Sequence, residues 1–453
     1  MSRMHTRVGK IVTLVVTAVV AVGLAVAPAR ARASSSSGTV TLTYRLWDPN
    51  EQIGYQQSIN LFEKKYPTIK VRIEQVPYGD YFTKLTTEFA AGNAPDLFWD
   101  QIPRFPDFVR EGGLLDLTPY IRRDHVNTNI YFQNLLKAYQ YQGHQYGLPK
   151  DWDTIALVYN KTLVQKMGVT MPSTLTWRPD GSGTFLPLLR KLTVDTKGRR
   201  PTQTGFDPTH VKQYGFVTVN NNQQQYWNYI AMNGGSIITK PYGQFAFDGP
   251  QANQALQFLV DLILKWHVSP SAAETNPPIA NPDIQLFAAQ RAAIIEVGDW
   301  NVSFLSKQTN FPVGIAPLPS GPAGRVSVFN GLADAIYAKT KHPQEAWELF
   351  KWLASPASQK ILGSGGYIWP AVKNLDSTYQ DYWRGKGIDV SPYLEEANGK
   401  TIAYPVTPGY TAAAQKIDNI FNLMYLGQLP VSAATTQAVQ AANQAVQQAA
   451  TGE

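Results

Sequence analysis

Residues 90–99 read Ala-Ala-Gly-Asn-Ala-Pro-Asp-Leu-Phe-Trp and join the end of one regular element to the start of another. Apolar residues upstream recur with helical spacing, and Asp80 is the expected N-cap of that helix. Gly92 is its expected end, because glycine readily adopts the left-handed backbone that follows many helices. The apolar residues 95–99 then predict a short buried strand. This stretch therefore predicts a helix that leads into a strand.

The residues before this stretch contain the same two kinds of element. Residues 40–46 alternate between apolar and polar side chains, which predicts a strand. Apolar residues between Ile53 and Tyr66 mark one face of a helix that ends before Pro67. A second strand is expected around residues 71–73. Strand, helix, strand, helix and strand in this order indicate parallel βαβ units in an α/β fold.

Similar segments recur along the rest of the chain. Further strands or buried apolar segments are expected at 155–159, 214–219, 292–297 and 333–338, and helices at 161–168, 251–266, 343–353 and 431–450. The last of these helices is rich in Ala and Gln and is expected to be an exposed packing helix. A chain of 453 residues is too long for one ordinary core, so two domains are expected.

Residues 1–33 are expected to be a signal peptide. A basic start is followed by an apolar run at 11–27 and by the small residues of Ala31-Arg32-Ala33, so the mature chain should begin at Ser34. The alternative is a retained membrane anchor. The apolar run is shorter than the roughly 20 residues that span a bilayer, which favours cleavage. We therefore expect a soluble periplasmic or secreted protein.

Charge and cysteine content exclude several classes. The leader carries five basic and no acidic residues, so the 40 basic and 33 acidic residues of the whole chain leave about +2 for the remainder. No dense basic run follows, and nucleic acid is not an expected partner. The chain has no cysteine, which excludes disulfides, thiolate metal sites and a lipid-modified cysteine anchor. The few scattered histidines give no metal-binding spacing, so neither a metal nor a cofactor is expected.

Carboxylates beside tryptophans are the main chemical signal. Asp151 and Asp153 flank Trp152, and Asp299 precedes Trp300. Paired acids are what a glycosidase needs. A sugar-binding protein uses the same residues differently, because Trp packs on the apolar face of a sugar ring while Asp accepts hydrogen bonds from its hydroxyls. The chain has no P-loop, zinc-protease or nucleophile-elbow motif. These residues alone favour binding over hydrolysis and leave both open.

Four local patterns resemble the family 1 extracellular solute-binding proteins of ATP-binding-cassette (ABC) importers, the maltose-binding-protein-like family. They are AAGNAPDLFW at 90–99, YGLP at 146–149 with LVYNK at 157–161, AAIIEVGDW at 292–300, and PQEAWELFKWL at 343–353. Their order along nearly the whole chain makes the resemblance specific. It implies a non-catalytic receptor that captures a mono- or oligosaccharide and delivers it to an ABC permease and ATPase.

The resemblance also implies an α/β clamp of two lobes, each a mainly parallel sheet flanked by helices. The first lobe is expected to comprise residues 34–150 with 301–354, and the second 151–300 with 355–453. The chain is expected to cross between the lobes three times, near Lys150–Thr154, Gly298–Asn301 and Ala354–Pro356. Ligand would lie in the cleft between the lobes, which close over it. The receptor is expected to act as a monomer.

Carried onto this sequence, the resemblance implies a set of ligand-binding residues, and Trp300 is the foremost. The set is Trp47, Asp48, Asn50, Trp99, Asp100, Asp151, Trp152, Asp153, Trp227, Asn228, Asp299, Trp300, Asn330, Gly331, Tyr367, Trp369, Tyr404 and Tyr410. Asn330 departs from the family pattern, which has Gly there. Asp48 and Asp100 are equally consistent with helix N-caps, and Trp227 with the inner face of a helix.

Two other classes of function stay open. A secreted carbohydrate-active enzyme would use the paired carboxylates for hydrolysis. A binder of polyamine, iron or phosphate would need a surplus of acids, clustered Tyr, or Gly/Ser-rich helix starts, respectively. The several candidate Trp residues favour a sugar over these solutes.

Overall fold

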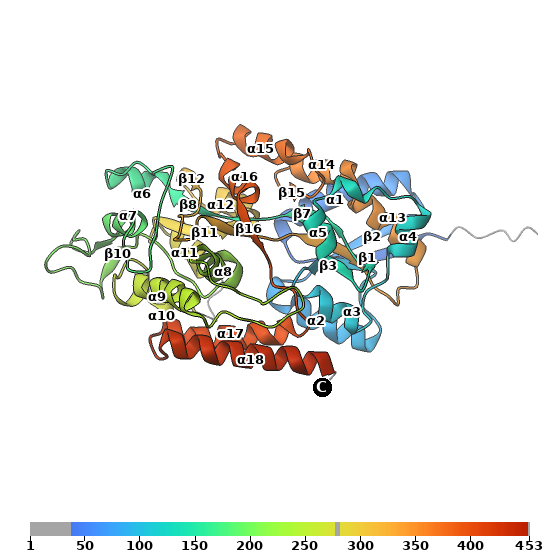
Figure 1. Cartoon of the computed structure of the whole chain (residues 1–453). Helices are drawn as coiled ribbons and strands as arrows, with labels where there is room; N and C mark the ends of the chain where they lie inside the picture. The colour runs from blue at the N-terminus through green and yellow to red at the C-terminus, as the bar shows by residue number, and fades with distance from the viewer. Residues whose placement is uncertain (1–37, 277–280, 452–453) are drawn as a thin grey trace, which may run out of the picture. The chain divides into compact units, whose positions relative to one another are not determined.

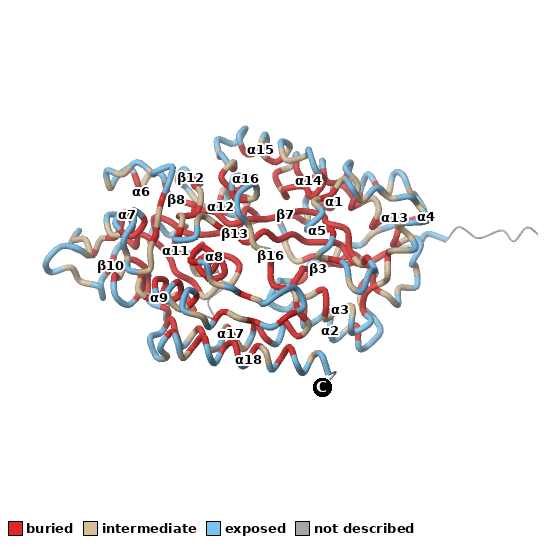
Figure 2. Tube along the Cα trace, viewed as in Figure 1, coloured by how far each residue is buried: buried red, intermediate tan, exposed pale blue. Residues whose placement is uncertain are grey.

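A computed structural model describes residues 38–276 and 281–451. The expected signal peptide, 1–33, lies outside the described residues. Residues 39–453 form one unit, and two main sheets organise it. In Figure 1, strands of the first sheet lie among the blue helices, and strands of the second lie among the green and yellow ones. Figure 2 shows the strands of both sheets as largely buried, apart from the edge strand at residues 69–75. No helix in the described ranges is both long and apolar enough to cross a bilayer.

The first sheet is mainly parallel, as the sequence predicts. Its order is β2-β1-β3-β14-β6. The strands are β1 (Val40–Leu46), β2 (Ile69–Gln75), β3 (Leu97–Gln101), β6 (Leu148–Pro149) and β14 (Leu332–Ile336). β1 runs parallel to β2 and β3, and only β14 runs against its neighbours β3 and β6. The βαβ units expected around residues 90–99 are confirmed.

Two helices join the first three strands, and their ends differ in one respect from expectation. α1 (Pro49–Lys65) begins after Asp48, whose side chain accepts from the amides of Asn50 and Glu51. α2 (Tyr78–Ala91) begins after Pro77, so Asp80 is a first-turn residue and its expected role as N-cap is wrong. Its carboxylate there still complements the positive end of the helix. Gly92 has φ 75° and ends α2 as predicted.

The second sheet is antiparallel, which corrects the expectation of a mainly parallel sheet in each lobe. Its order is β11-β8-β12, with β8 (Ile155–Asn160) between β11 (Ile294–Gly298) and β12 (Val313–Ala316). β8 pairs with both neighbours antiparallel. The reason lies in the path of the chain: β8 leads away from the segment that joins the sheets, and the other two strands lead back toward it.

The strand expected at 214–219 is also not formed. Tyr214 makes only an isolated bridge with Ala292. Beyond it, the Phe216 amide donates to the Val268 carbonyl oxygen and the Thr218 amide to Ser269 Oγ. These residues are buried and apolar like a strand, but their backbone groups bond to a loop instead of a neighbouring strand.

The chain passes between the sheets at places that differ partly from the expected ones. The first passage, residues 150–154 between β6 and β8, is as predicted. The second is Asn330–Gly331, between β13 (Val326–Phe329) and β14. It is not at Gly298–Asn301, because β12 follows that segment and still pairs with β8. The expected grouping of residues 301–354 with the first lobe is therefore wrong for the part before residue 330.

The third passage comes later than Ala354–Pro356. α13 (Pro343–Leu353) packs on the first sheet, and α14 (Pro356–Ser364) packs against α1. β15 (Trp369–Pro370) then pairs with β7 (Asp151–Trp152), and α16 (Ser391–Asn398) packs on β8 and β13. The chain therefore crosses between α14 and α16. The division of the remaining residues between two lobes stays a prediction.

The C-terminal helices α17 (Tyr410–Tyr425) and α18 (Val431–Thr451) lie side by side along the lower edge of Figure 1. Buried alanines at 434, 438, 442 and 445 form the contact stripe of α18 at helical spacing, so its expected role as a packing helix is confirmed. Further helices are α3 (Phe105–Arg110), α6 (Lys161–Lys166), α8 (Trp227–Met232), α9 (Pro250–Leu264), α12 (Val302–Gln308) and α15 (Asp376–Gly385).

The remaining elements are short. They are α4 (Thr118–Arg123), α5 (Gln133–Ala138), α7 (Phe185–Leu192), α10 (Ala272–Thr275), α11 (Pro282–Ala288), η1 (Thr128–Ile130), η2 (Asn222–Tyr226), η3 (Asp299–Asn301), β4 (Gln140–Tyr141), β5 (His144–Gln145), β9 (Val194–Asp195), β10 (Val211–Gln213) and β16 (Lys400–Ala403). η2 is a single turn of π-helix, a form that is frequent at functional sites.

Candidate ligand-binding pocket

A pocket of about 330 Å³ lies where the passages meet the ends of β1, β3 and β11. This volume falls in the range typical of small-molecule sites. Its walls are rich in aromatic, amide and carboxyl side chains. They are Trp47, Asp48, Glu51, Tyr78, Gln101, Asp151, Trp152, Asp153, Asn221, Asn222, Gln223, Gln224, Asn281, Asp299, Trp300, Asn301, Asn330, Leu332, Tyr367, Ile368, Trp369 and Tyr404.

Most of the residues expected from the sequence line this pocket. They are Trp47, Asp48, Asp151, Trp152, Asp153, Asp299, Trp300, Asn330, Tyr367, Trp369 and Tyr404. Asp48 combines both roles considered for it, because Oδ1 caps α1 at 2.7 Å from the Asn50 amide while the residue faces the pocket. That these side chains contact a ligand stays a prediction.

Trp300 is held in place by the residue two positions before it. A Cβ at Gly298 would lie 1.8 Å from the Trp300 ring, so the ring packs directly over the glycine. Trp300 is half-buried and lines the pocket. The glycine of the AAIIEVGDW segment is therefore required by the position of the indole.

Trp152 and Trp369 form a fixed aromatic wall. Their ring centroids are 4.6 Å apart and stacked, in the register set by β7 and β15. Trp152 Nε1 donates to Asp376 at 3.2 Å. Both rings are almost fully buried, so they offer a ligand little surface.

Four expected residues are buried in the core instead. Trp99 and Asp100 lie inside β3, and Trp99 Nε1 donates to the Tyr44 hydroxyl at 2.7 Å. Trp227 packs against Phe247 at the start of α8. Asn228 Oδ1 accepts from the Val328 amide at 2.7 Å and so secures β13. Each of these side chains is occupied by packing or by a backbone hydrogen bond.

The other three exceptions are next to pocket residues in sequence or in contact with them. Asn50 Oδ1 accepts from Lys307 Nζ of α12 at 2.9 Å. Tyr410 donates to the hydroxyl of Tyr404, which itself reaches the pocket. Gly331 allows two backbone segments to approach closely, because a Cβ there would lie 2.4 Å from the Asp151 carbonyl oxygen.

Gly331→Ala tests this close approach. We expect the substitution to lower the free energy of unfolding by about 1–3 kcal/mol, because the two passages would have to move apart. Urea unfolding followed by tryptophan fluorescence measures the change. Gly385→Ala is the matched control, since no atom lies within 4 Å of a Cβ at that position. Equal losses in the two variants would contradict the close packing of the passages.

The floor of the pocket carries a buried ion cluster. Lys150 Nζ lies 2.5 Å from Asp151 Oδ2, 3.4 Å from Glu51 Oε2 and 3.9 Å from the centre of the Trp99 ring. Asp151 Oδ1 also accepts from the Leu332 amide at 2.7 Å. Lys150 is therefore the cation that balances charge beneath the pocket.

Asp153 and Asp299 belong to the same cluster. Asp153 accepts from Gln223 Nε2 at 2.6 Å and from Asn330 Nδ2 at 3.0 Å, and Asp299 accepts from the Thr154 amide at 3.1 Å. Burial, followed by repulsion between neighbouring carboxylates, raises the pKa of both well above the usual range. Burial also raises the pKa of Glu51 to about 8, although Lys150 opposes this change.

Comparison with known proteins identifies the family. The sequence profile of the family described as Bacterial extracellular solute-binding protein matches residues 48–360. The chain belongs to this family. The structure of UspC from M. tuberculosis is 34% identical, covers 90% of this chain and 100% of its own, and superposes with a TM-score of 0.71.

Further relatives of this solute-binding protein carry sugar-related names. The arabinooligosaccharide-binding protein of Bacillus subtilis is 28% identical over 397 residues, covering 85% of this chain and 82% of its own. Lmo0181 of Listeria monocytogenes, solved in complex with cycloalternan, is 22% identical over 90% of this chain and 98% of its own. Its TM-score of 0.78 supports the two-lobed fold.

Sequence reasoning missed half of the pocket wall of this solute-binding protein. The missed residues are Glu51, Tyr78, Gln101, Asn221, Asn222, Gln223, Gln224, Asn281, Asn301, Leu332 and Ile368. A signal for part of the set was present, because residues 220–225 form an uninterrupted run of six amide side chains. Such a run beside a buried apolar segment indicates amides held inside the protein for hydrogen bonding.

Proposed function

We propose that this protein is an exported receptor that binds a mono- or oligosaccharide in the pocket and delivers it to the permease and ATPase of an ABC importer. One observation carries the proposal: the pocket combines the half-buried indoles of Trp47 and Trp300 with a dense set of amide and carboxylate groups. Indoles pack on the apolar faces of sugar rings, and the polar groups match their hydroxyls. The sugar-related names of the relatives agree with this proposal.

The hydrogen bonds of Asp151 and Asp153 favour a receptor over an enzyme. Both oxygens of Asp151 and both oxygens of Asp153 accept hydrogen bonds within the protein. A nucleophile or general base needs an oxygen free to meet the substrate or a water. The function we propose is therefore binding without turnover. We further expect the receptor to act as a monomer, with no nucleic-acid partner, no metal and no cofactor.

Export is part of the proposal. We expect residues 1–33 to be removed, which leaves Ser34 as the first residue of the receptor, in the periplasm or outside the cell. The two lobes are expected to move about the passages, so that ligand contacts from both are made together.

Calorimetric titration of the purified protein with mono- to tetrasaccharides tests the proposal. We expect saturable binding of at least one saccharide, and no new reducing ends after incubation with any of them. A bound sugar should also stabilise the protein, by about 2.7 kcal/mol at a hundred times its dissociation constant. Release of reducing ends would contradict the receptor assignment, and so would failure to bind any saccharide.

A further inference from the structure

The elements packed on the first sheet (the first-sheet side) and those packed on the second (the second-sheet side) touch outside the pocket as well. Helix α3 belongs to the first-sheet side, because its Phe108 ring packs against Phe98 of β3. Helix α17 belongs to the second-sheet side, because its Phe421 ring packs against Tyr226 of η2, and η2 contacts β11. A bond between α3 and α17 therefore joins the two sides.

One such bond joins Asp107 of α3 to the start of α17. Asp107 Oδ1 accepts from the amide of Gly409, the N-cap of α17, at 2.6 Å. The first amides of a helix have no acceptor within that helix, and a carboxylate placed there also faces its positive end. An amide donates to a carboxyl oxygen whether or not the group is ionised, so the raised pKa that burial gives Asp107 does not remove this bond. Asp107 thus supplies an acceptor that α17 lacks.

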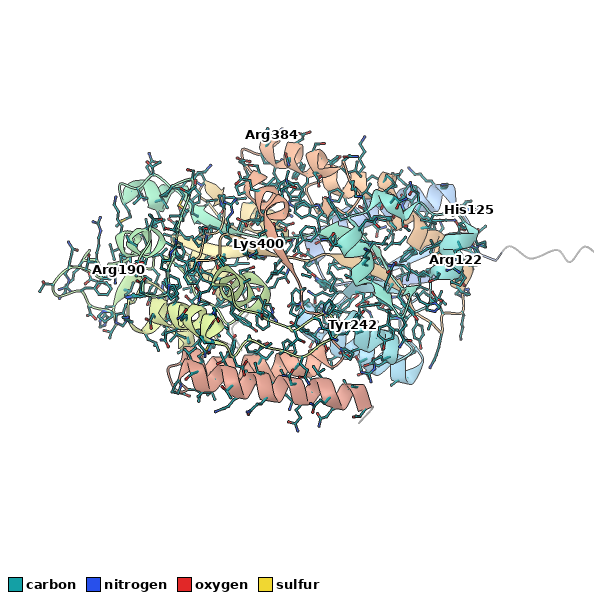
Figure 3. The ribbon with its side chains drawn as sticks, in the orientation of Figure 1. Arg122, His125, Arg190, Tyr242, Arg384 and Lys400 are labelled. Carbon is teal, nitrogen blue, oxygen red and sulfur yellow. The ribbon has the colours of Figure 1, made fainter. Side chains whose placement is uncertain are left out.

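A second bond crosses the same boundary at Tyr242. This residue lies at the tip of the turn formed by residues 238–245, whose Phe245 ring packs against Trp227 at the start of α8, directly after η2. The Tyr242 hydroxyl donates to the Gln140 carbonyl oxygen at 3.0 Å, in the β4–β5 hairpin that leads into β6 of the first sheet. In Figure 3 its label lies with the blue elements of the first-sheet side, to the right of α8. The turn therefore reaches across from the second-sheet side.

Tyr242 has an unfavourable backbone conformation in this contact. Its φ is 61°, a region where residues other than glycine are uncommon. Its amide donates to the Val406 carbonyl oxygen at 2.7 Å, and its ring meets that of Tyr141 edge to face, with centroids 5.9 Å apart. Strained residues held by surrounding contacts cluster at ligand clamps and switch regions. The backbone is thus a second, independent sign that this contact has a function.

Neither contact includes a residue of the pocket wall. Asp107, Gly409, Gln140 and Tyr242 all lie outside the pocket lining. A ligand in the pocket would not touch them, so their contribution to the free energy of lobe closure is the same with and without a ligand.

We propose that Asp107 and Tyr242 form a latch that favours the closed arrangement of the two lobes before a ligand binds. This inference rests on the proposed receptor function and concerns the regulation of its pocket. The apparent affinity of a ligand that binds the closed state rises with the fraction of molecules that are closed. The lobes must still open to admit a ligand, and two hydrogen bonds of ordinary strength permit this. Asp107 and Tyr242 are therefore positioning residues, which touch no ligand and set the ratio of closed to open receptor.

Distance measurements on the ligand-free protein test the latch. The chain has no cysteine, so Thr86→Cys on α2 and Gln437→Cys on α18 place two spin labels at exposed positions, one on each side. Electron–electron double resonance should give mainly one, shorter distance while the latch is intact. In the labelled protein, Asp107→Ala and Tyr242→Phe should each lower the ratio of closed to open molecules by about fivefold, the effect of one lost hydrogen bond. The double variant should lower it by about 25-fold, because the two contacts share no residue.

Asp80→Ala and Tyr120→Phe are the matched controls. Asp80, like Asp107, is an acid in the first turn of a helix on the first-sheet side, but it is exposed. Tyr120 is a half-buried tyrosine of α4 that packs against Trp347 on the same side. Neither control should change the distances. Urea unfolding separates lobe opening from loss of structure, and if Asp107→Ala does not fold, Tyr242→Phe alone decides the question.

The distances give a clear outcome. A longer distance that appears in the double variant and not in the controls would support the latch. Unchanged distances in the double variant would overturn it, and so would a longer distance that already dominates while the latch is intact. Because no ligand enters this experiment, its failure leaves the proposed sugar-binding function standing, whereas failure of every saccharide to bind refutes that function alone.

Discussion

Trp300→Ala is expected to weaken sugar binding by about 2–4 kcal/mol, which is the range for a buried aromatic anchor at a binding site. One side of the indole lies over Gly298. Because glycine has no side chain, it cannot fill the space that the removed ring leaves. Its removal takes away a large apolar surface from the wall of a pocket that is otherwise mostly polar. Calorimetry with a saccharide that binds the unaltered protein measures the loss.

Phe304→Ala is the control for this experiment. Phe304 is an aromatic residue of α12, close to Trp300 in sequence, but it is 37% exposed and does not line the pocket. Its removal should leave affinity unchanged. A Trp300→Ala protein that folds and binds normally would remove Trp300 from the site and leave the receptor function untouched.

Lys150→Met is expected to lower the free energy of unfolding by about 3–5 kcal/mol, because it leaves Asp151 and Glu51 buried without their cation. Burial already holds the pKa of Glu51 above its usual value, so the folded protein binds a proton that the unfolded chain releases. Stability therefore falls as the pH rises above the ordinary range of Glu. Without Lys150 the pKa of Glu51 should rise further, so this fall should continue to higher pH and the loss should be greater at alkaline pH.

Urea unfolding at a mildly acidic and an alkaline pH measures both effects. Lys84→Met is the matched control, since Lys84 is exposed and lies 4.0 Å from Glu88 in an i,i+4 pair. Such a surface pair contributes less than about 1 kcal/mol. A Lys150→Met protein as stable as this control at both pH values would show that the cluster does not depend on its lysine.

The sequence allowed the first sheet to be predicted almost strand by strand. Alternation at residues 40–46 and the glycine at 92 are local signals, and local signals determine where an element starts and ends. Strand direction in the second sheet could not be predicted from local signals, because the pairing of β8 with β11 depends on the path of more than a hundred intervening residues. The pattern at 292–297 predicts a buried segment and contains no information on its partner.

The predicted site was right where a strand ends and wrong where a strand continues. Trp47 and Asp48 follow β1, and Asp299 and Trp300 follow β11, and all four reach the pocket. β3 runs two residues beyond the expected end at Trp99, so Trp99 and Asp100 are part of the sheet. Gln101 takes the pocket position that was expected of them.

Asp153 gives the first two passages a common mechanical property. Its backbone pairs with that of Asn330 through a bridge in both directions, and its carboxylate accepts from the Asn330 side chain. The passages therefore form a short two-stranded ribbon. A ribbon bends readily across its flat face and resists twisting and shear, because those motions would break the rungs between its strands. We therefore expect any movement of one lobe against the other to follow the direction in which this ribbon bends most readily, so that both walls of the pocket return to the same register after each opening.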